Sequence, residues 1–256
     1  MTDQKYTRET VISMTEWVPG KLFSITTTRD HAFQFEPGQF ARLGLPASDD
    51  PTAEPSIWRA YSMVSTPEDE FLSFYSIVVP EGEFSPRLAG LKTGDPIYID
   101  KTAFGFLTID RFPQGGNLWL LATGTGLSAY ISMLNTPATW ERFDKIILAH
   151  GVRTSEELTY QDDIAKWQQQ FGDRFVYLPL PTREAYKNYP QERLTTLISN
   201  SKLEQLSGLK LDPATSRVML CGNPEMLSEA RKILAEKGFA AGRRGIPGNL
   251  AVENYW

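Results

Sequence analysis

The sequence predicts two domains: an N-terminal antiparallel β-barrel over residues 1–110, followed by a doubly wound parallel α/β sheet over residues 111–256. The chain length of 256 residues is ample for two compact domains. Before residue 110, short runs rich in Thr, Val, Ile and aromatic residues are broken by Gly, Pro and Asp, as in antiparallel strands. After Asn117, continuous apolar runs alternate with helical patterns, which indicates parallel strands covered on both faces.

The N-terminal domain is expected to contain roughly six strands at hairpin spacing, a set that a barrel closes. The expected strands are Tyr6–Trp17, Leu22–Arg29, Gln39–Leu45, Ala60–Ser65, Phe71–Val79 and Pro96–Asp100. One helix is expected at Ser85–Leu91, with Ser85 as its N-cap and Pro86 at its first position.

The second domain is expected to alternate strands and helices. Its predicted parallel strands are Leu118–Ala122, Lys145–Ala149, Phe175–Leu180 and Val218–Cys221. Its predicted helices are Leu127–Leu134, Glu157–Phe171, Glu192–Gln205 and Glu225–Lys237, the last capped by Asn223. In such a sheet, ligands bind at the carboxyl ends of the strands.

Composition excludes several classes of protein. A net charge of −5 argues against a general nucleic-acid binder. A single cysteine, Cys221, leaves no intramolecular disulfide, four-cysteine cluster or zinc ribbon, and two histidines make a histidine-rich metal site unexpected. No apolar run approaches the ~18 residues of a membrane span, and no secretory signal is evident. We therefore expect a cytoplasmic protein with no bound metal and neither a membrane nor a nucleic-acid partner.

Two segments of the barrel carry groups that suit a flavin nucleotide. Arg59-Ala60-Tyr61-Ser62 offers a cation for a pyrophosphate, a flat aromatic face and a hydroxyl donor on one short strand. The segment from Tyr75 to Ser85 runs from a strand through a Gly turn into a helix start, where free backbone N–H groups suit a diphosphate. Taken alone, the first segment is more typical of a surface arginine and a core tyrosine, and the second of a plain N-cap; the two in order, about 20 residues apart, favour the flavin nucleotide.

Two segments of the α/β domain suit a second nucleotide. Thr123-Gly124-Thr125-Gly126 follows a buried strand, and its glycines allow a ligand to approach the backbone closely. Cys221-Gly222-Asn223-Pro224 ends the last apolar strand, where a thiol could pack on a nicotinamide ring. A tight strand–helix turn and a small core cysteine remain the alternatives.

In this order and spacing, R-x-Y-S, G-x-x-S, T-G-T-G, C-G-N-P and an aromatic C-terminus resemble the ferredoxin–NADP(H) reductase family, and most closely its bacterial ferredoxin/flavodoxin members. The resemblance implies FAD and NADP(H) as cofactors, with an aromatic tail that returns to the flavin. The FAD contacts that it implies are Arg59, Ala60, Tyr61, Ser62, Tyr75, Ser76, Ile77, Val78, Glu83, Phe84, Ser85, Thr125, Tyr255 and Trp256. The implied NADP(H) contacts are Val152, Arg153, Thr182, Arg183, Arg193, Met219, Leu220, Cys221, Gly222 and Asn223. Ser62, Cys221, Glu253 and Tyr255 would lie at the reaction centre.

The three arginines of this set carry the preference for NADP(H), because a 2′-phosphate needs cations. Glu192, beside Arg193, could weaken that preference. The implied activity is hydride exchange with NADP(H) and single-electron exchange with ferredoxin or flavodoxin, carried out by a monomer. A free-flavin reductase, an oxygenase-reductase component, a cytochrome b5-type NADH reductase and a non-catalytic flavin-binding module remain alternatives at this stage.

Overall fold

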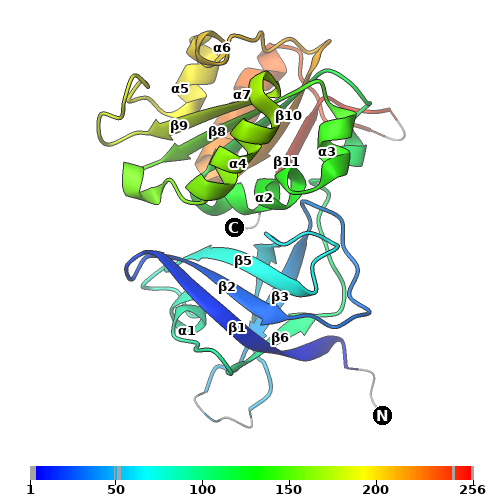
Figure 1. Ribbon diagram of the computed structural model, residues 1–256, viewed down its shortest axis with the longest axis vertical. Helices are drawn as coiled ribbons and strands as arrows, with labels where there is room; N and C mark the ends of the chain where they lie inside the picture. Colours follow the sequence, from blue (N-terminus) through cyan, green and yellow to red (C-terminus); the bar gives the residue numbers. More distant parts are fainter. Residues whose placement is uncertain (1–3, 49, 51–52, 244–245, 255–256) are drawn as a thin grey trace.

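The computed structural model describes residues 4–48, 50, 53–243 and 246–254. It shows an antiparallel sheet domain below a parallel α/β domain in the view of Figure 1, which confirms the predicted fold class. Within the described ranges, no helix has the length and apolar character needed to cross a membrane.

The lower domain is a six-stranded antiparallel sheet in the order β4-β3-β6-β1-β2-β5. Its strands are β1 Tyr6–Val18, β2 Leu22–Thr28, β3 Phe40–Leu45, β4 Ile57–Ser62, β5 Phe71–Ile77 and β6 Pro96–Asp100. The outer strands meet just beyond the end of β4: Met63 bridges Phe74, and the Val64 amide donates to the Ser73 carbonyl at 2.7 Å. The sheet thereby curls into a near-barrel around an apolar core that includes Ile25, Leu43 and Phe74.

Strand β4 begins three residues before the predicted Ala60. Ile57 pairs with Leu45 and Trp58 pairs with Gly44 across the β3–β4 ladder. A Cβ on Gly44 would lie 2.7 Å from the Trp58 ring, so this glycine makes the room that the indole occupies. The pairing partner, rather than the propensity of the Trp58 region itself, sets the start of the strand.

Ser85 does not cap the short helix α1 (Ser85–Ala89), so the predicted N-cap is wrong. The capping position belongs to Phe84, and no side chain bonds there. The Ser85 hydroxyl instead accepts the Val79 backbone amide at 2.9 Å and closes the turn between β5 and α1. A hydroxyl satisfies whichever free amide the turn brings nearest, and here that amide lies six residues before it.

The upper domain is a five-stranded parallel sheet in the order β11-β10-β7-β8-β9. Its strands are β7 Asn117–Thr123, β8 Lys145–Val152, β9 Phe175–Pro181, β10 Ser216–Cys221 and β11 Leu250–Glu253. The helices are α2 Ser128–Leu134, α3 Pro137–Arg142, α4 Gln161–Phe171, α5 Leu194–Ser199, α6 Lys202–Ser207 and α7 Pro224–Glu236. Short 3-10 turns are η1 Ile109–Arg111, η2 Gly124–Leu127, η3 Ser155–Glu157 and η4 Gly172–Arg174.

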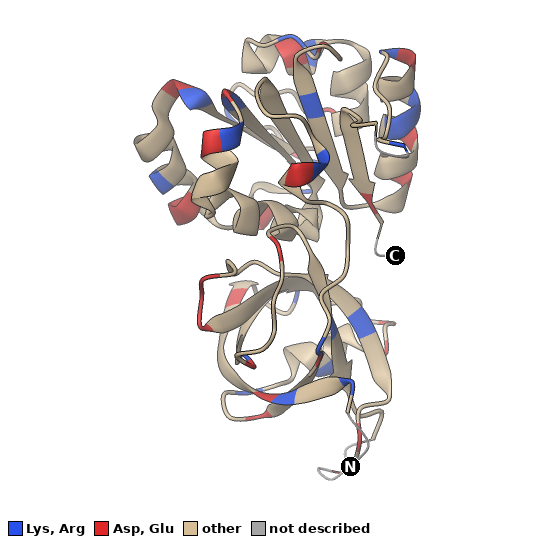
Figure 2. Ribbon diagram, turned by 90° about the vertical axis from the view of Figure 1, so that its right-hand side faces the viewer, with Lys and Arg blue, Asp and Glu red and all other residues tan. Residues whose placement is uncertain are grey.

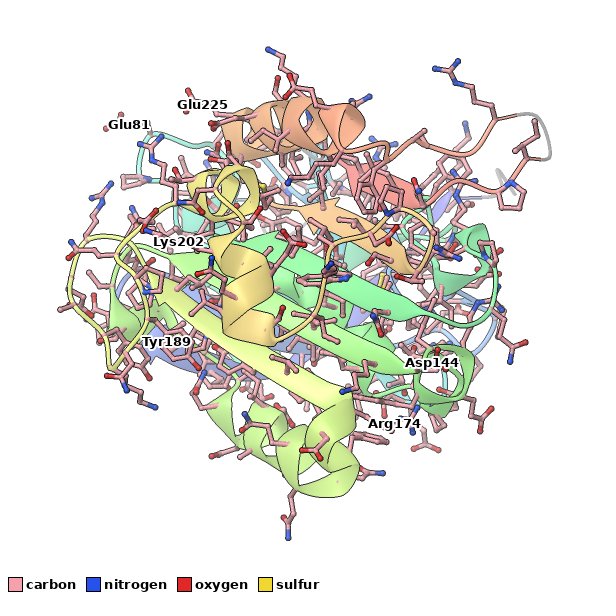
Figure 3. The ribbon with its side chains drawn as sticks, turned by 90° about the horizontal axis from the view of Figure 1, so that it is seen from above. Glu81, Asp144, Arg174, Tyr189, Lys202 and Glu225 are labelled. Atoms are coloured by element: carbon pink, nitrogen blue, oxygen red, sulfur yellow. The ribbon has the colours of Figure 1, made fainter. Side chains whose placement is uncertain are left out.

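Alternate residues along β7 pack into two separate cores. Leu118 and Leu120 pack with α2, α3 and α4 on one face, whereas Trp119 and Leu121 pack with α5, α6 and α7 on the other. Seen from above, the sheet lies between these two helical layers (Figure 3). Asn223 accepts the amides of Glu225 and Met226 and caps α7 as predicted.

Two predicted helices are interrupted, and two elements were not predicted. The helix expected over Glu157–Phe171 is a 3-10 turn and then α4, because Tyr160 between them has a left-handed backbone with φ 57°. The helix expected over Glu192–Gln205 is divided into α5 and α6 by Ser201, with φ 61°. Helix α3 and strand β11 were absent from the prediction; β11 adds a fifth parallel strand beside β10.

Polar and aromatic side chains join the two domains. The Tyr160 hydroxyl lies 2.6 Å from Ser24 Oγ, and its ring packs 4.7 Å from that of Trp17 on β1. The Thr159 hydroxyl donates to the Tyr75 hydroxyl at 3.0 Å. The left-handed backbone at Tyr160 therefore coincides with a buried contact to the barrel, which offsets the local conformational cost.

Candidate functional site

Two cavities lie side by side at the junction of the domains, with volumes of about 390 and 470 Å³. Both volumes fall within the roughly 300–1,000 Å³ typical of small-molecule and cofactor sites. Tyr75, Ile77 and Thr125 line both cavities, so the two cavities adjoin at this shared wall.

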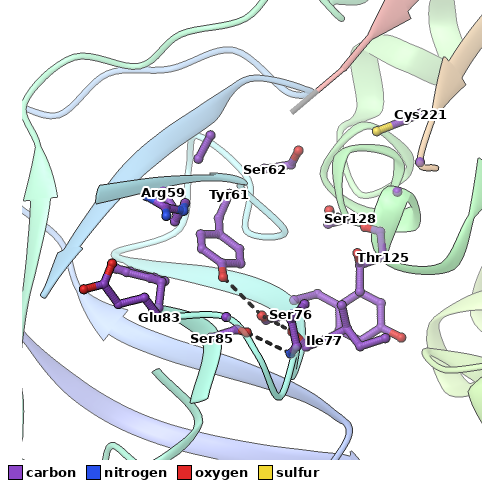
Figure 4. A pocket seen from close by; sticks show the side chains of 17 residues that line it. Arg59, Tyr61, Ser62, Ser76, Ile77, Glu83, Ser85, Thr125, Ser128 and Cys221 are labelled. Carbon is purple, nitrogen blue, oxygen red and sulfur yellow. Dashed lines mark hydrogen bonds between the residues drawn. The ribbon is translucent and has the colours of Figure 1, made fainter. Parts of the chain in front are cut away.

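The barrel side of the first cavity carries the predicted R-x-Y-S segment on β4 (Figure 4). Ser76 Oγ lies 3.4 Å from the Tyr61 hydroxyl, and the Tyr61 ring packs 5.8 Å from the Phe84 ring. Burial raises the pKa of Tyr61, so the phenol stays neutral and presents an aromatic face. The remaining barrel residues of this cavity are Arg59, Ala60, Ser62, Tyr75, Ile77, Val79, Gly82, Glu83 and Ser85.

The α/β side of the first cavity is built where the ends of β7 and β10 touch. A Cβ on Gly126 would come 2.4 Å from the carbonyl oxygen of Cys221, and a Cβ on Gly222 would come 2.2 Å from Thr123 Oγ1. These two glycines are thus required by the close approach of two protein segments. For Gly126, this reason differs from the ligand approach suggested by the sequence. Thr125 and Ser128 complete this wall.

Cys221 lines the cavity but is 1 % exposed. Burial, with a smaller contribution from the nearby Glu253 carboxylate, raises its thiol pKa to about 12. The sulfur is therefore a neutral packing group rather than a nucleophile at physiological pH.

A buried histidine supports the turn that separates the cavities. His150 on β8 is fully buried, and its Nε2–H donates to the Gly124 carbonyl at 3.0 Å. Burial lowers its pKa to about 4, so the imidazole is neutral. Within the described part of the chain, its Nδ1 has no hydrogen-bond partner. No motif in the sequence predicts a role for this residue.

The second cavity contains the three predicted arginines, Arg153, Arg183 and Arg193, together with Val152, Thr182 and Asn223. Arg153 follows β8 and Arg183 follows β9, and the backbone amide of Arg183 donates to the carbonyl of Arg153 at 2.9 Å. Neighbouring parallel strands therefore bring these two side chains together at their carboxyl ends.

Three acidic residues line the same cavity: Glu157, Glu225 and Glu229. Figure 2 shows basic and acidic residues interspersed over this domain.

Some predicted site residues lie elsewhere. Met219 and Leu220 are fully buried in the two cores and line neither cavity. Val78 packs against the barrel core, although its neighbours Ile77 and Val79 line the first cavity. Glu253 accepts the Leu107 amide at 3.2 Å. Tyr255 and Trp256 lie outside the described residues.

Glu192, which precedes Arg193 in the sequence, interacts with Asn200 and Lys202. It accepts from the Asn200 amide at 3.0 Å and forms an ion pair with Lys202, which is labelled in Figure 3. It does not line the second cavity.

Several residues of both cavities were not predicted as individual contacts from the sequence. Most of these residues belong to no recognisable motif; the i, i+4 spacing of Arg153 and Glu157 was the available hint. Val79, Gly82, Thr123, Gly124 and Gly126 lie within the predicted nucleotide segments, although they were not named as individual contacts. The lining residues outside those segments are Ser128 in the first cavity, and Leu22, Gly151, Glu157, Leu194, Thr195, Glu225, Met226 and Glu229 in the second.

A barrel that presents an arginine and a tyrosine, joined to a parallel sheet that presents three arginines, is typical of two-domain oxidoreductases that bind nucleotides. A family model for the oxidoreductase NAD-binding domain matches residues 120–232. The chain is 39% identical over 254 residues to the ferredoxin–NADP reductase of Pseudomonas aeruginosa, covering 96% of this chain and 95% of that protein. It is 33% identical to the flavodoxin/ferredoxin–NADP reductase of Escherichia coli, covering 95% of this chain and all of that protein.

A crystal structure of a ferredoxin NADP+ reductase from Neisseria gonorrhoeae, with bound FAD and NADP, superimposes with a TM-score of 0.91 at 34% identity. The match covers 99% of this chain and 100% of that one. The chain belongs to the ferredoxin–NADP reductase family, as its motifs predicted.

Proposed function

We propose that the protein is an FAD-dependent ferredoxin/flavodoxin–NADP(+) reductase, with FAD in the first cavity and NADP(H) in the second. The observation that carries the proposal is the wall formed by Tyr75, Ile77 and Thr125, because residues that line both cavities place the two proposed cofactor sites next to each other. Residues 1–110 would form the FAD domain and residues 111–256 the NADP domain.

The chemistry of the first cavity fits FAD. Arg59 is exposed and supplies a cation for the pyrophosphate, while Tyr61 supplies a neutral aromatic face for the ring. Ser62 carries a hydroxyl that would donate to the ring nitrogen N5, and Glu83, Phe84 and Ser85 would flank the pyrophosphate. Tyr255 and Trp256 are proposed to cover the flavin.

The second cavity fits NADP(H). Arg153, Arg183 and Arg193 provide the cations that a 2′-phosphate requires. Gly222, which lines the first cavity, and Asn223, which lines the second, would direct the nicotinamide toward the shared wall beside Cys221 and Thr125.

The residues of this chain orient the bound ligands and exclude water from the site. They do not act as an acid–base pair. The flavin, when bound, supplies the chemistry that converts a hydride into single electrons. Cys221 is protonated and packed, and His150 is neutral and bonded to the protein backbone, so neither is placed to exchange a proton with substrate. Glu253 is proposed to lie near the reaction centre through the C-terminal segment.

The decisive experiment is an anaerobic absorbance titration of the FAD-loaded protein with NADPH and then with NADH. Bleaching by NADPH at much lower concentration is expected. Arg153→Ala and Arg183→Ala should raise the KM for NADPH by about tenfold or more with little change for NADH. Equal effects on both coenzymes, or a protein that cannot be loaded with FAD, would contradict the proposal.

The proposed electron partners are ferredoxin, flavodoxin or both. Turnover of NADPH that depends on an added ferredoxin or flavodoxin, and not on free flavin, separates this function from that of a flavin reductase. A cytoplasmic monomer without a membrane or nucleic-acid partner remains a prediction, which fractionation and sedimentation analysis would check.

A further inference from the structure

We propose that Glu157 is a positioning residue for the 2′-phosphate of NADP(H), acting through Arg153, and that Lys21 of the barrel holds Glu157 in place. This inference rests on the proposed function, because it takes Arg153 as a ligand of that phosphate. It adds an acidic residue, and a residue of the other domain, to the determinants of coenzyme preference.

Both oxygens of the Glu157 carboxylate are engaged by Arg153. The backbone amide of Arg153 donates to Oε2 at 2.9 Å, and its side-chain Nε donates to Oε1 at 2.9 Å. One carboxylate therefore fixes the main chain of Arg153 at the end of β8 and the base of its guanidinium. The two terminal nitrogens of the guanidinium make no hydrogen bond to the described residues, and the side chain is 42% exposed in a cavity wall.

Lys21 approaches the same carboxylate from the barrel. Its Nζ lies 2.5 Å from Oε1 of Glu157, a contact between the β1–β2 turn and the α/β domain. The Glu157 side chain is only 5% exposed, whereas that of Lys21 is 31% exposed. The carboxylate is thus buried between two cations supplied by different domains.

The ionised form of Glu157 is the one that the surroundings stabilise. Burial by itself would raise its pKa, but hydrogen bonds from Lys21 and Arg153 bring the pKa below its ordinary value. The cluster of Lys21, Arg153 and Glu157 keeps a net charge of +1, so it still attracts an anion.

A long, flexible arginine normally loses rotamer freedom when it binds a phosphate. Here the contacts with Glu157 restrict the Arg153 side chain before the coenzyme arrives. The Glu157 carboxylate also lies close to where the 2′-phosphate would bind, and the two negative charges repel each other. The two effects have opposite signs: if positioning dominates, loss of the Glu157 charge weakens 2′-phosphate binding, and if repulsion dominates, it strengthens binding.

The test compares adenosine 2′-monophosphate with adenosine 5′-monophosphate, titrated calorimetrically into the FAD-loaded protein. Glu157→Gln should weaken binding of the 2′-phosphate by about tenfold and change that of the 5′-phosphate by less than about twofold. In an Arg153→Ala background, the same Glu157→Gln substitution should have no further effect. Asp163→Asn is the matched control, since it removes one charge from an ion pair with Lys166 on α4, in which the Asp163 side chain is 34% exposed.

Lys21→Met tests the barrel contact separately and does not depend on the folding of the Glu157 variant. It should weaken 2′-phosphate binding by about threefold and raise the KM for NADPH while leaving kcat unchanged. Unchanged or tighter 2′-phosphate binding by Glu157→Gln, or an unaffected Lys21→Met protein, would overturn the inference. If Arg153→Ala itself leaves binding unchanged, the proposed phosphate site fails instead, so the two failures are distinguishable.

Discussion

Replacing Gly126 with alanine would place a Cβ 2.4 Å from the Cys221 carbonyl oxygen and 2.7 Å from the Gly222 amide nitrogen. Both neighbours are backbone atoms, so no flexible side chain can give way. Ordinary contact begins near 3.4 Å, so the η2 turn and the end of β10 must separate by about 1 Å. Overpacking of this kind costs about 1–3 kcal/mol of stability. A displacement of about 1 Å in an active site can lower the rate about 100-fold.

The assay combines kcat for NADPH-dependent reduction of ferredoxin with urea unfolding of the Gly126→Ala protein. Gly208→Ala is the control, because Gly208 ends α6 with φ +70° and a Cβ there would meet nothing within 4 Å. The control should lose about 1 kcal/mol through its left-handed backbone and keep its kcat. Wild-type kcat in Gly126→Ala would refute the argument that this contact sets the geometry of the shared wall.

Two further predictions concern buried groups. The unfolded protein binds a proton at His150 below about pH 6.5 whereas the folded protein does so only below about pH 4, so stability is lost as the pH falls between these values. Between pH 7.5 and 5 this residue should account for about 2 kcal/mol, and urea unfolding of His150→Asn should show a correspondingly flatter pH dependence. Cys221 is the sole cysteine, so labelling by a thiol reagent at pH 8 should be negligible until the protein is unfolded. Rapid labelling of the native protein would show that the thiol is accessible.

The elements that could be predicted are those whose signals are local. Gly and Pro separate the barrel strands, and the apolar runs of β7 to β10 need no partner to be recognised. Strand β11 has four residues and exists through its pairing with β10, so a short apolar segment alone did not reveal it. Likewise, Tyr160 interrupts a helical pattern because its side chain is bound by Ser24 and Trp17 of the other domain.

The same distinction holds for the candidate site. Compact motifs make three site residues predictable from the sequence: Arg59, Tyr61 and Thr125. The structure brings all three to one cavity. Lys21 and Glu157 are separated by more than 130 positions in the sequence and by a domain boundary, so their contact follows only from how the domains pack. His150 directly follows the predicted strand Lys145–Ala149, and nothing in the sequence indicates its hydrogen bond to the Gly124 carbonyl.

The wall shared by the two cavities has a thermodynamic consequence for the proposed cofactors. If coenzyme bound in the second cavity orders Tyr75, Ile77 and Thr125, it changes the affinity of the first cavity for flavin. Thermodynamic linkage then requires bound flavin to change the affinity of the second cavity for coenzyme by the same factor. The equilibrium dissociation constant of the flavin would then depend on coenzyme occupancy. A coenzyme that tightens flavin binding fivefold is itself held about fivefold more tightly by the flavin-loaded protein than by the apoprotein.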